Sequence, residues 1–187
     1  MKFLSFEQSQ HPIAEIKDNN KFKKSKIIYL ESDGEVNSGF NHFKIDDGRL
    51  QLLPNKNIER SILYVAGQSG SGKTWFCKEY LLEYQKIFPK NEIYMFSTVS
   101  DDPSLKEVKI NYIDVSSIVD DDLDSSDFKD SMVLFDDIEN ISEKKVKNAV
   151  TKVLNHILVT GRHFNTSCIM TNHNLYNGIH TKLQLNV

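Results

Sequence analysis

The chain of 187 residues has few cysteines, no long apolar run and no excess of positive charge, and each of these shortages excludes a class of protein. It has two cysteines, Cys77 and Cys168, both in apolar segments, which favours buried free thiols over a disulfide framework. No stretch approaches the roughly 20 consecutive apolar residues of a membrane span, and the N-terminus lacks the apolar core of a signal peptide. We therefore expect a soluble protein that is not secreted and has no transmembrane segment.

The chain also lacks an excess of positive charge. The formal net charge is −3, which argues against a bulk electrostatic grip on nucleic acid and leaves only a local patch or several subunits acting together. Only three of the 23 basic residues are arginines, so each arginine deserves separate consideration. A hydrophobic content of 39% and a charged content of 26% are otherwise ordinary for a globular protein with a substantial core.

The pattern of the first 58 residues differs from that of the rest. Residues 1–25 are polar, and we expect a weakly ordered arm or a segment that orders on a partner. Residues 26–30 form an apolar run typical of a strand, and turn signals separate them from a second run at 50–53. The segment 1–58 is therefore predicted to combine a polar arm with a small β element.

From residue 59 onward, apolar strands alternate with helical patterns. The predicted strands are 61–66, 92–97, 110–113, 131–135 and 167–171, and the predicted helices are 73–87 and 143–160, the second capped by Ser142. This alternation is typical of βαβ units and a mainly parallel sheet. We expect an α/β domain over residues 59–187, with a sheet flanked by helices. Its acidic stretch, residues 120–130, indicates a solvated or mobile connector.

One motif points to a ligand. The segment Gly67-Gln68-Ser69-Gly70-Ser71-Gly72-Lys73-Thr74 fits the P-loop pattern of a glycine, four residues, then Gly-Lys-Ser/Thr. A polyphosphate needs many N–H donors close together, and glycines let the backbone approach it. Because a predicted strand precedes the motif and a helix follows it, we expect a P-loop NTPase. Lys73 would bind the β- and γ-phosphates of ATP, and the Thr74 hydroxyl would bind Mg²⁺.

A pair of carboxylates follows the predicted strand 131–135. Asp136 is expected to hold Mg²⁺ through its water shell. Asp137 stands where many such ATPases carry the glutamate that polarises the attacking water, but aspartate is one methylene shorter, so nearby Glu139 is a rival for this role. Asn172 and His173 follow the next predicted strand, where P-loop ATPases often place a polar residue that senses the γ-phosphate. His173 is interpreted either as such a sensor or as a hydrogen-bonded structural histidine.

Arg162 has two interpretations. Its guanidinium could reach the γ-phosphate bound by a neighbouring subunit and stabilise the transition state. Alternatively, it is a cation placed favourably at the C-terminal end of helix 143–160.

Three segments together resemble the genome-packaging ATPases of large DNA viruses, the poxvirus-type enzymes of the FtsK/HerA class. They are residues 70–74, residues 134–137 and, most specifically, Gly161-Arg162-His163-Phe164-Asn165-Thr166-Ser167. The resemblance covers roughly residues 61–175. It implies a homo-oligomeric ring, expected to be hexameric, that hydrolyses ATP to pump double-stranded DNA into a capsid. It also implies that Arg162 acts on the neighbouring subunit.

The same resemblance implies contacts with capsid or virion proteins and a location at the viral assembly site of the host cytoplasm or in the virion. Two features depart from it. His173 stands where relatives commonly carry a glutamine, and the chain ends soon after the strand 167–171 where relatives continue, so it is interpreted either as a short family member or as a fragment truncated at the C-terminus. Two alternatives stay open: another P-loop NTPase such as a helicase-loader-like ATPase, and a nucleotide-dependent assembly module with little turnover.

Overall fold

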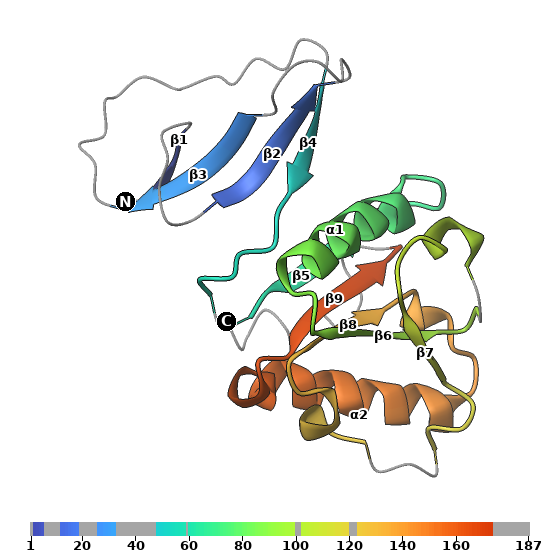
Figure 1. Cartoon of the computed structure of the whole chain (residues 1–187). Helices are drawn as coiled ribbons and strands as arrows, with labels where there is room; N and C mark the ends of the chain where they lie inside the picture. The colour runs from blue at the N-terminus through green and yellow to red at the C-terminus, as the bar shows by residue number, and fades with distance from the viewer. Residues whose placement is uncertain are drawn as a thin grey trace. The chain divides into compact units, whose positions relative to one another are not determined.

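The computed structural model describes residues 2–5, 12–18, 26–32, 48–58, 60–99, 102–119 and 123–173. The chain divides into two compact units, Met1–Ile58 and Glu59–Val187. Each unit contains one β-sheet (Figure 1). Within the described ranges, no helix is long and apolar enough to cross a membrane.

The N-terminal unit is a four-stranded antiparallel sheet with strand order β1-β3-β2-β4. Its strands are β1 (Lys2–Ser5), β2 (Pro12–Asp18), β3 (Lys26–Ser32) and β4 (Gly48–Leu52). The expectation of a weakly ordered arm was therefore wrong for β1 and β2. The physical reason is long-range pairing: β2 is polar but lies between β3 and β4, and Ala14 is buried opposite the buried Ile28.

The second unit contains a five-stranded parallel sheet with strand order β5-β9-β8-β6-β7. The strands are β5 (Ile62–Ala66), β6 (Glu92–Ser97), β7 (Asn111–Asp114), β8 (Ser131–Phe135) and β9 (Ser167–Asn172), and the long helices are α1 (Lys73–Ile87) and α2 (Lys144–Thr160). Four short 3₁₀ turns complete it: η1 (Pro103–Leu105), η2 (Ser125–Phe128), η3 (Ile138–Asn140) and η4 (Gly161–Phe164). The predicted α/β fold class, a P-loop NTPase fold with a small β element before it, is confirmed.

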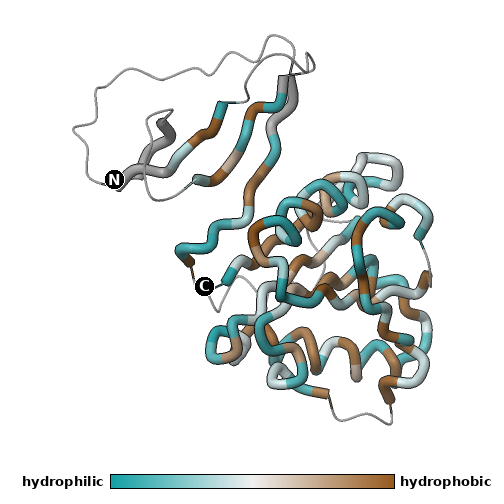
Figure 2. The backbone as a smooth tube through the Cα atoms, in the orientation of Figure 1, coloured by the Kyte–Doolittle hydropathy of each residue, from teal (hydrophilic) through white to brown (hydrophobic). Residues whose placement is uncertain are grey.

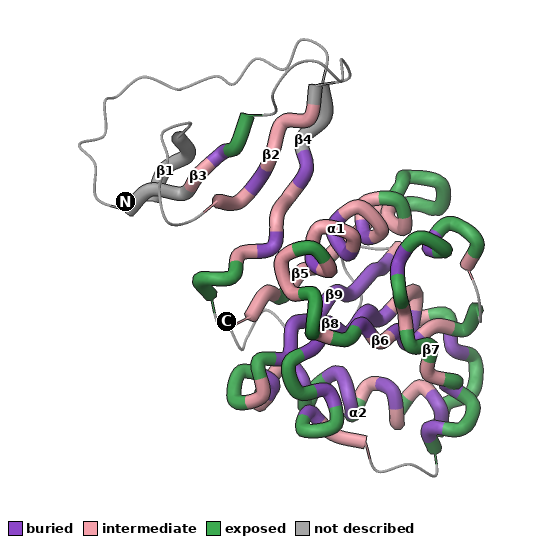
Figure 3. The backbone as a smooth tube through the Cα atoms, in the orientation of Figure 1, coloured by how far each residue is buried: buried purple, intermediate pink, exposed green. Residues whose placement is uncertain are grey.

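The two long helices cover opposite faces of the parallel sheet (Figure 1). Side chains alternate between the faces of a strand, so Val133 and Phe135 lie on the face that packs against α2, whereas Met132 and Leu134 lie on the α1 face. All five residues of β8 are buried, as are all six of β9 (Figure 3). Residues 132–135 of β8 and 168–170 of β9 are hydrophobic, and the centre of the sheet is largely brown in the hydropathy view (Figure 2). This is typical of a parallel sheet covered on both faces, although β9 ends in the polar Thr171 and Asn172.

The N-terminal end of α2 differs from the prediction by one residue, whereas its C-terminal end, Thr160, agrees. The helix begins at Lys144 and its N-cap is Glu143, so Ser142 does not cap it. At the other end, the guanidinium of Arg60 donates to two carbonyl oxygens, those of Ile157 at 2.6 Å and Leu158 at 2.8 Å. The last carbonyls of a helix lack intrahelical partners and carry partial negative charge. Arg60 therefore fills the role that one interpretation of the sequence assigned to Arg162.

The loop Gly161–Ser167, which joins α2 to β9, is held by side-chain hydrogen bonds. The amide of Asn165 donates to Asp130 Oδ1 at 2.9 Å, and the Thr166 hydroxyl donates to the carbonyl of Phe128 at 2.9 Å. Both Asn165 and Asp130 adopt positive φ angles, of 53° and 51°. The polar residues of this loop therefore fix its shape against the turn that precedes β8.

The acidic stretch has more structure than a solvated connector. In its described part, the Asp124 side chain accepts from the backbone of η2 while the Asp127 side chain accepts from the Asp124 N–H, which is a capping box. Asp130 holds Asn165, as described above. Asp124 and Asp127 thus cap η2 and Asp130 accepts from Asn165, so the expectation was incomplete for these three residues.

The contact between Arg60 and Gly161 generates a test of the fold. A Cβ on Gly161 would lie 2.9 Å from Arg60 Nη1, so the Gly161→Ala variant should displace the guanidinium and weaken its bonds to α2. We expect a loss of about 1–2 kcal/mol in the free energy of unfolding, measured with urea on the full chain. In an Arg60→Ala background the same change should be neutral or slightly stabilising, because Gly161 has helical backbone angles. Equal losses in both backgrounds would contradict this account.

Candidate nucleotide site

Three parallel strands bring the candidate site residues together at the C-terminal ends of the strands. β5 leads into the P-loop, β8 ends before Asp136, and β9 ends before His173. The loops are joined by backbone bonds: the Gly67 N–H donates to the Asn172 carbonyl at 3.0 Å, and the Asp136 N–H donates to the Phe96 carbonyl at 2.9 Å. The carboxyl ends of parallel strands are where ligands bind in open α/β sheets. The structure therefore places the P-loop and the carboxylates side by side.

The P-loop has the backbone form that its sequence predicts. Gly72, the N-cap of α1, has a φ of 90°, which a residue with a Cβ rarely adopts. A Cβ on Gly67 would lie 2.5 Å from Ser71 Oγ and 3.2 Å from Ser71 Cβ, so a larger residue there would force the Ser71 side chain to move. Helix α1 has no side-chain cap and no acidic residue in its first turn. Its first N–H groups and its positive dipole end are therefore available to an anion.

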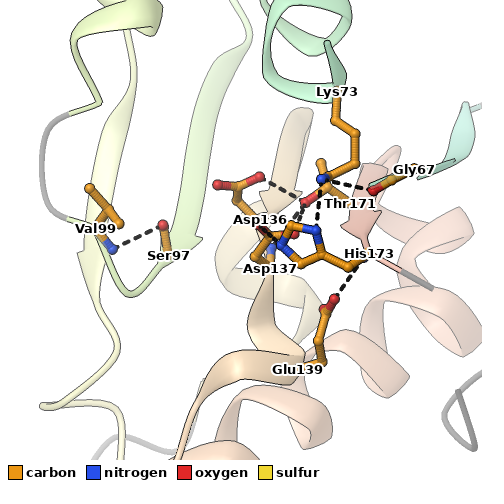
Figure 4. A network of polar contacts seen from close by, with 9 residues as sticks. All are labelled: Gly67, Lys73, Ser97, Val99, Asp136, Asp137, Glu139, Thr171 and His173. Atoms are coloured by element: carbon orange, nitrogen blue, oxygen red, sulfur yellow. Dashed lines mark hydrogen bonds and ion pairs between the residues drawn. The ribbon is translucent and has the colours of Figure 1, made fainter. Parts of the chain in front are cut away.

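Lys73 begins α1, and its side chain crosses the site. Its ammonium donates to the Gly67 carbonyl at 3.1 Å and lies 3.2 Å from His173 Nδ1 (Figure 4). Thr74 follows it in the first turn and is half-buried. The remaining loop residues, Gln68, Ser69, Gly70 and Ser71, are exposed.

Thr171 joins the two aspartates, and the sequence analysis missed it. Its hydroxyl donates to Asp136 Oδ1 at 2.7 Å and accepts the N–H of Asp137 at 3.0 Å (Figure 4). It is fully buried at the end of β9. A signal was present in the sequence, because a polar residue that ends an apolar strand next to the aspartate strand needs a polar partner.

Asp137 and His173 form a close pair. Asp137 has a φ of 47° although it is not glycine, and its Oδ2 lies 2.8 Å from His173 Nε2. The backbone N–H of His173 donates to Glu139 Oε1 at 2.8 Å. A left-handed residue of this kind costs about 1–3 kcal/mol and persists only where its surroundings determine it, which is common at functional sites. Asp137, Glu139 and His173 are thus one connected group.

The electrostatics of the site favour a cation. Burial raises the pKa of Asp136, and the nearby carboxylates of Asp137 and Asp102 raise it further, while the Thr171 hydrogen bond and Lys73 oppose this. The site contains the Lys73 ammonium and several carboxylates, so its net charge is negative. Carboxylate oxygens are hard donors, which Mg²⁺ prefers. The half-buried carboxylate of Asp136 therefore suits a magnesium ion, and Thr74, in the first turn of α1, would supply a hydroxyl.

A second donor set lies beside it but is already satisfied. One ligand atom from each of Asp137, Glu139 and His173 lies within 4.8 Å of the others. Hydrogen bonds join the three residues, and the Lys73 ammonium lies against the imidazole. A cation therefore already occupies the neighbourhood, and the grouping is explained without a further metal.

The two cysteines are buried free thiols, as expected from the sequence. Burial raises the pKa of Cys77 to about 12, and the Asp136 and Asp137 carboxylates contribute. Burial likewise raises the pKa of Cys168 to about 12. Neither thiol is ionised near neutral pH, so both act as small apolar side chains.

Arg162 is not brought to this site. It lies in η4 before β9, whereas Lys73 and His173 lie beyond the other end of the same strand. Six residues of strand span about 20 Å, which exceeds the reach of an arginine side chain. Arg162 and its neighbour His163 are both exposed. The guanidinium therefore cannot serve the P-loop of its own chain.

A comparison with solved structures found chains of low sequence identity. The genome packaging NTPase B204 from Sulfolobus turreted icosahedral virus 2, in complex with sulfate, is 16% identical with a TM-score of 0.41, over 64% of this chain and 68% of that chain. The conjugation coupling protein TcpA of pCW3 with ATPγS is 9% identical with a TM-score of 0.47, over 89% of this chain and 62% of that chain.

No family model matches the sequence. A comparison with curated proteins found the uncharacterized protein V3 of Sputnik virophage, which is 36% identical over 182 residues. The match covers 95% of this chain and 70% of V3. Identity at this level over almost the whole chain reflects common descent, and the chain therefore belongs to the family of the Sputnik virophage protein V3.

Proposed function

We propose that this chain is an ATP-hydrolysing motor that translocates double-stranded viral DNA into a capsid. The observation that carries the proposal is the convergence of Lys73, Asp136 and the Asp137–His173 pair at the carboxyl edge of one parallel sheet. The site thus combines a phosphate-binding loop, a half-buried carboxylate that would hold a metal ion, and a pair of groups that would orient or deprotonate the attacking water. The relationship to a virophage protein supports a viral setting.

Each site residue takes a defined role in the proposal. The P-loop from Gly67 to Thr74 binds the phosphates through its N–H groups, and Lys73 binds the β- and γ-phosphates. Thr74 and Asp136 hold Mg²⁺, which would supply positive charge to the phosphates and to the charge that develops on them. Asp137 or Glu139 orients the attacking water, and His173 lies where a γ-phosphate would be sensed.

The position of Arg162 supports the proposal of an assembled ring. Arg162 is exposed at the N-terminal ends of the parallel strands, opposite the P-loop, and this position suits contact with the nucleotide of a neighbouring subunit. Such an arginine stabilises the transition state in other P-loop enzymes. A homohexameric ring would also gather DNA-binding groups from several subunits, which a single chain with a net charge of −3 needs. Capsid or virion proteins are the further partners proposed, at the assembly site in the host cytoplasm or in the virion.

The activity itself is the first test. We expect the full chain to hydrolyse ATP with Mg²⁺, and double-stranded DNA to raise the rate. The Lys73→Ala variant should lose about 10² to 10³ in turnover, because it lacks the ammonium that stabilises phosphate charge. The Lys86→Ala variant is the matched control, since Lys86 lies on the same helix in an exposed pair with Glu83. Tight ATP binding with negligible turnover would instead favour an assembly module, and turnover indifferent to DNA another NTPase.

A second prediction concerns the stability of the metal-free protein. Because burial raises the pKa of Asp136, the native state keeps this proton to a higher pH than the unfolded chain, and ionisation at pH 7 opposes folding. Asp136→Asn keeps an acceptor for Thr171 and removes that cost. We expect the free energy of unfolding in urea to rise by about 1 kcal/mol at pH 7, while Mg²⁺-dependent hydrolysis is lost.

The gain should shrink as the pH falls, because Asp136 is then protonated in both the native and the unfolded states. Asp114→Asn is the control of opposite sign, since hydrogen bonds from Ser116 hold the pKa of Asp114 below its usual value. That variant should lose stability at pH 7. A loss of stability in Asp136→Asn at pH 7 would overturn this account of the site.

A third prediction tests whether Arg162 acts on a neighbour. Arg162→Ala and Lys73→Ala chains, each inactive alone, should regain part of the ATPase activity when mixed, because an intact P-loop can then meet an intact arginine. His163→Ala is the control, since His163 is the adjacent exposed residue of η4. It should stay active alone. Mixtures that co-assemble, as shown by pull-down of differently tagged chains, yet stay inactive would remove Arg162 from the mechanism.

A further inference from the structure

The imidazole of His173 lies between the P-loop lysine and the aspartate pair. Its Nδ1 is 3.2 Å from Lys73 Nζ, and its Nε2 is 2.8 Å from Asp137 Oδ2 (Figure 4). Both ring nitrogens are therefore engaged, one on each side. The ring connects the group that would bind the γ-phosphate to the carboxylate expected to act on water.

The partners decide where the ring proton lies. A lysine ammonium has three donors and no acceptor, so Nδ1 must present its lone pair to Lys73. The carboxylate of Asp137 is an acceptor, so Nε2 carries the proton and donates it to Oδ2. In this arrangement the Nδ1 lone pair of His173 accepts from the Lys73 ammonium, and the Nε2 proton is held by Asp137.

The two acidic candidates for the base both hold this histidine. Asp137 Oδ2 accepts from the ring, and Glu139 Oε1 accepts from the backbone N–H of the same residue at 2.8 Å. The other oxygen of Asp137 lies 3.3 Å from the Thr171 hydroxyl. A base oriented by a carboxylate on its far nitrogen is the arrangement that activates nucleophiles in many enzymes.

We propose that His173 is the general base of ATP hydrolysis and that Asp137 is a positioning residue that orients it, an inference that rests on the proposed ATPase function. When Lys73 turns to the phosphates, Nδ1 faces the attacking water. The water proton passes to Nδ1 as its oxygen bonds to the γ-phosphorus. The bond from that phosphorus to the bridging oxygen breaks, and its electron pair stays on ADP. Asp137 stabilises the imidazolium until the proton leaves to phosphate or solvent.

Chemical rescue tests this assignment. The His173 side chain is 29% exposed, so His173→Gly should leave a cavity that imidazole in solution can enter. We expect this variant to bind ATP, monitored by the fluorescence of Trp75, the single tryptophan, and to lose about 10² to 10⁴ in turnover. Imidazole should raise the turnover of His173→Gly at least about tenfold. A purely structural histidine would show no such rescue.

The choice of rescuing molecule makes the test sharper. 1-Methylimidazole offers one lone pair but no N–H for Asp137, so it should rescue much less than imidazole. Rescue by imidazole should also weaken when Asp137→Asn is added, because an amide stabilises an imidazolium poorly. Equal rescue by both molecules, or rescue by imidazole that is unchanged in the Asp137→Asn background, would overturn the role of Asp137 as the orienting group.

A second variant guards against misfolding. His173→Gln keeps a side chain of similar length and the backbone bond to Glu139, and it should lose turnover with ATP binding intact. Because the pair acts as a unit, Asp137→Asn with His173→Gln should be no worse than His173→Gln alone. Multiplicative losses, or His173→Gln near wild-type turnover, would overturn the proposal. If the wild-type chain itself shows no Lys73-dependent hydrolysis, the proposed function fails instead.

Discussion

The parallel pairing of β9 between β5 and β8 is the constraint on which the whole site depends. Its register places Ala66 beside Asn172 and Phe135 beside Met170, so the P-loop, the aspartates and His173 leave the sheet at one edge. Side chains alternate along a strand, and a slip of one residue would turn Thr171 away from Asp136. The buried apolar residues on both faces of β8 and β9 make such a slip costly.

The site built on this register is held at a cost to stability. It half-buries the carboxylate of Asp136, holds Asp137 in a left-handed conformation and brings further acidic groups near one lysine. Thr171 and His173 supply the hydrogen bonds that keep these groups in place. Oxygen donors gathered in this way suit a hard divalent cation. A left-handed residue that is held by its surroundings is common at functional sites.

The two arginines around α2 show how similar residues acquire different roles. Arg60 is directed inward and satisfies the C-terminal carbonyls of the helix, while Gly161 leaves space for its guanidinium. Arg162, one residue beyond, is exposed on a turn whose neighbours are tied to the preceding segment by Asn165 and Thr166. The loop therefore uses its other polar residues to hold its shape and presents Arg162 at the surface.

What the sequence by itself determined is local. The bounds of α1, β6 and β8 were predicted residue for residue, because apolar periodicity and the glycines of the P-loop act over short distances. The start of α2 was predicted one residue too early, since its N-cap is Glu143 rather than Ser142. The composition of an α/β domain with a P-loop follows from the same local signals.

What only the tertiary structure decided is which distant residues meet. The strands β1 and β2 form because β3 and β4 pair with them, and their polar sequences carry little signal of their own. Thr171 reaches Asp136 across 35 positions of the chain, and His173 reaches Lys73 across 100. Such contacts arise from the order and register of strands, which hydrophobic burial selects globally. The sequence pattern therefore locates the chemical groups but does not determine which of them form hydrogen bonds with one another.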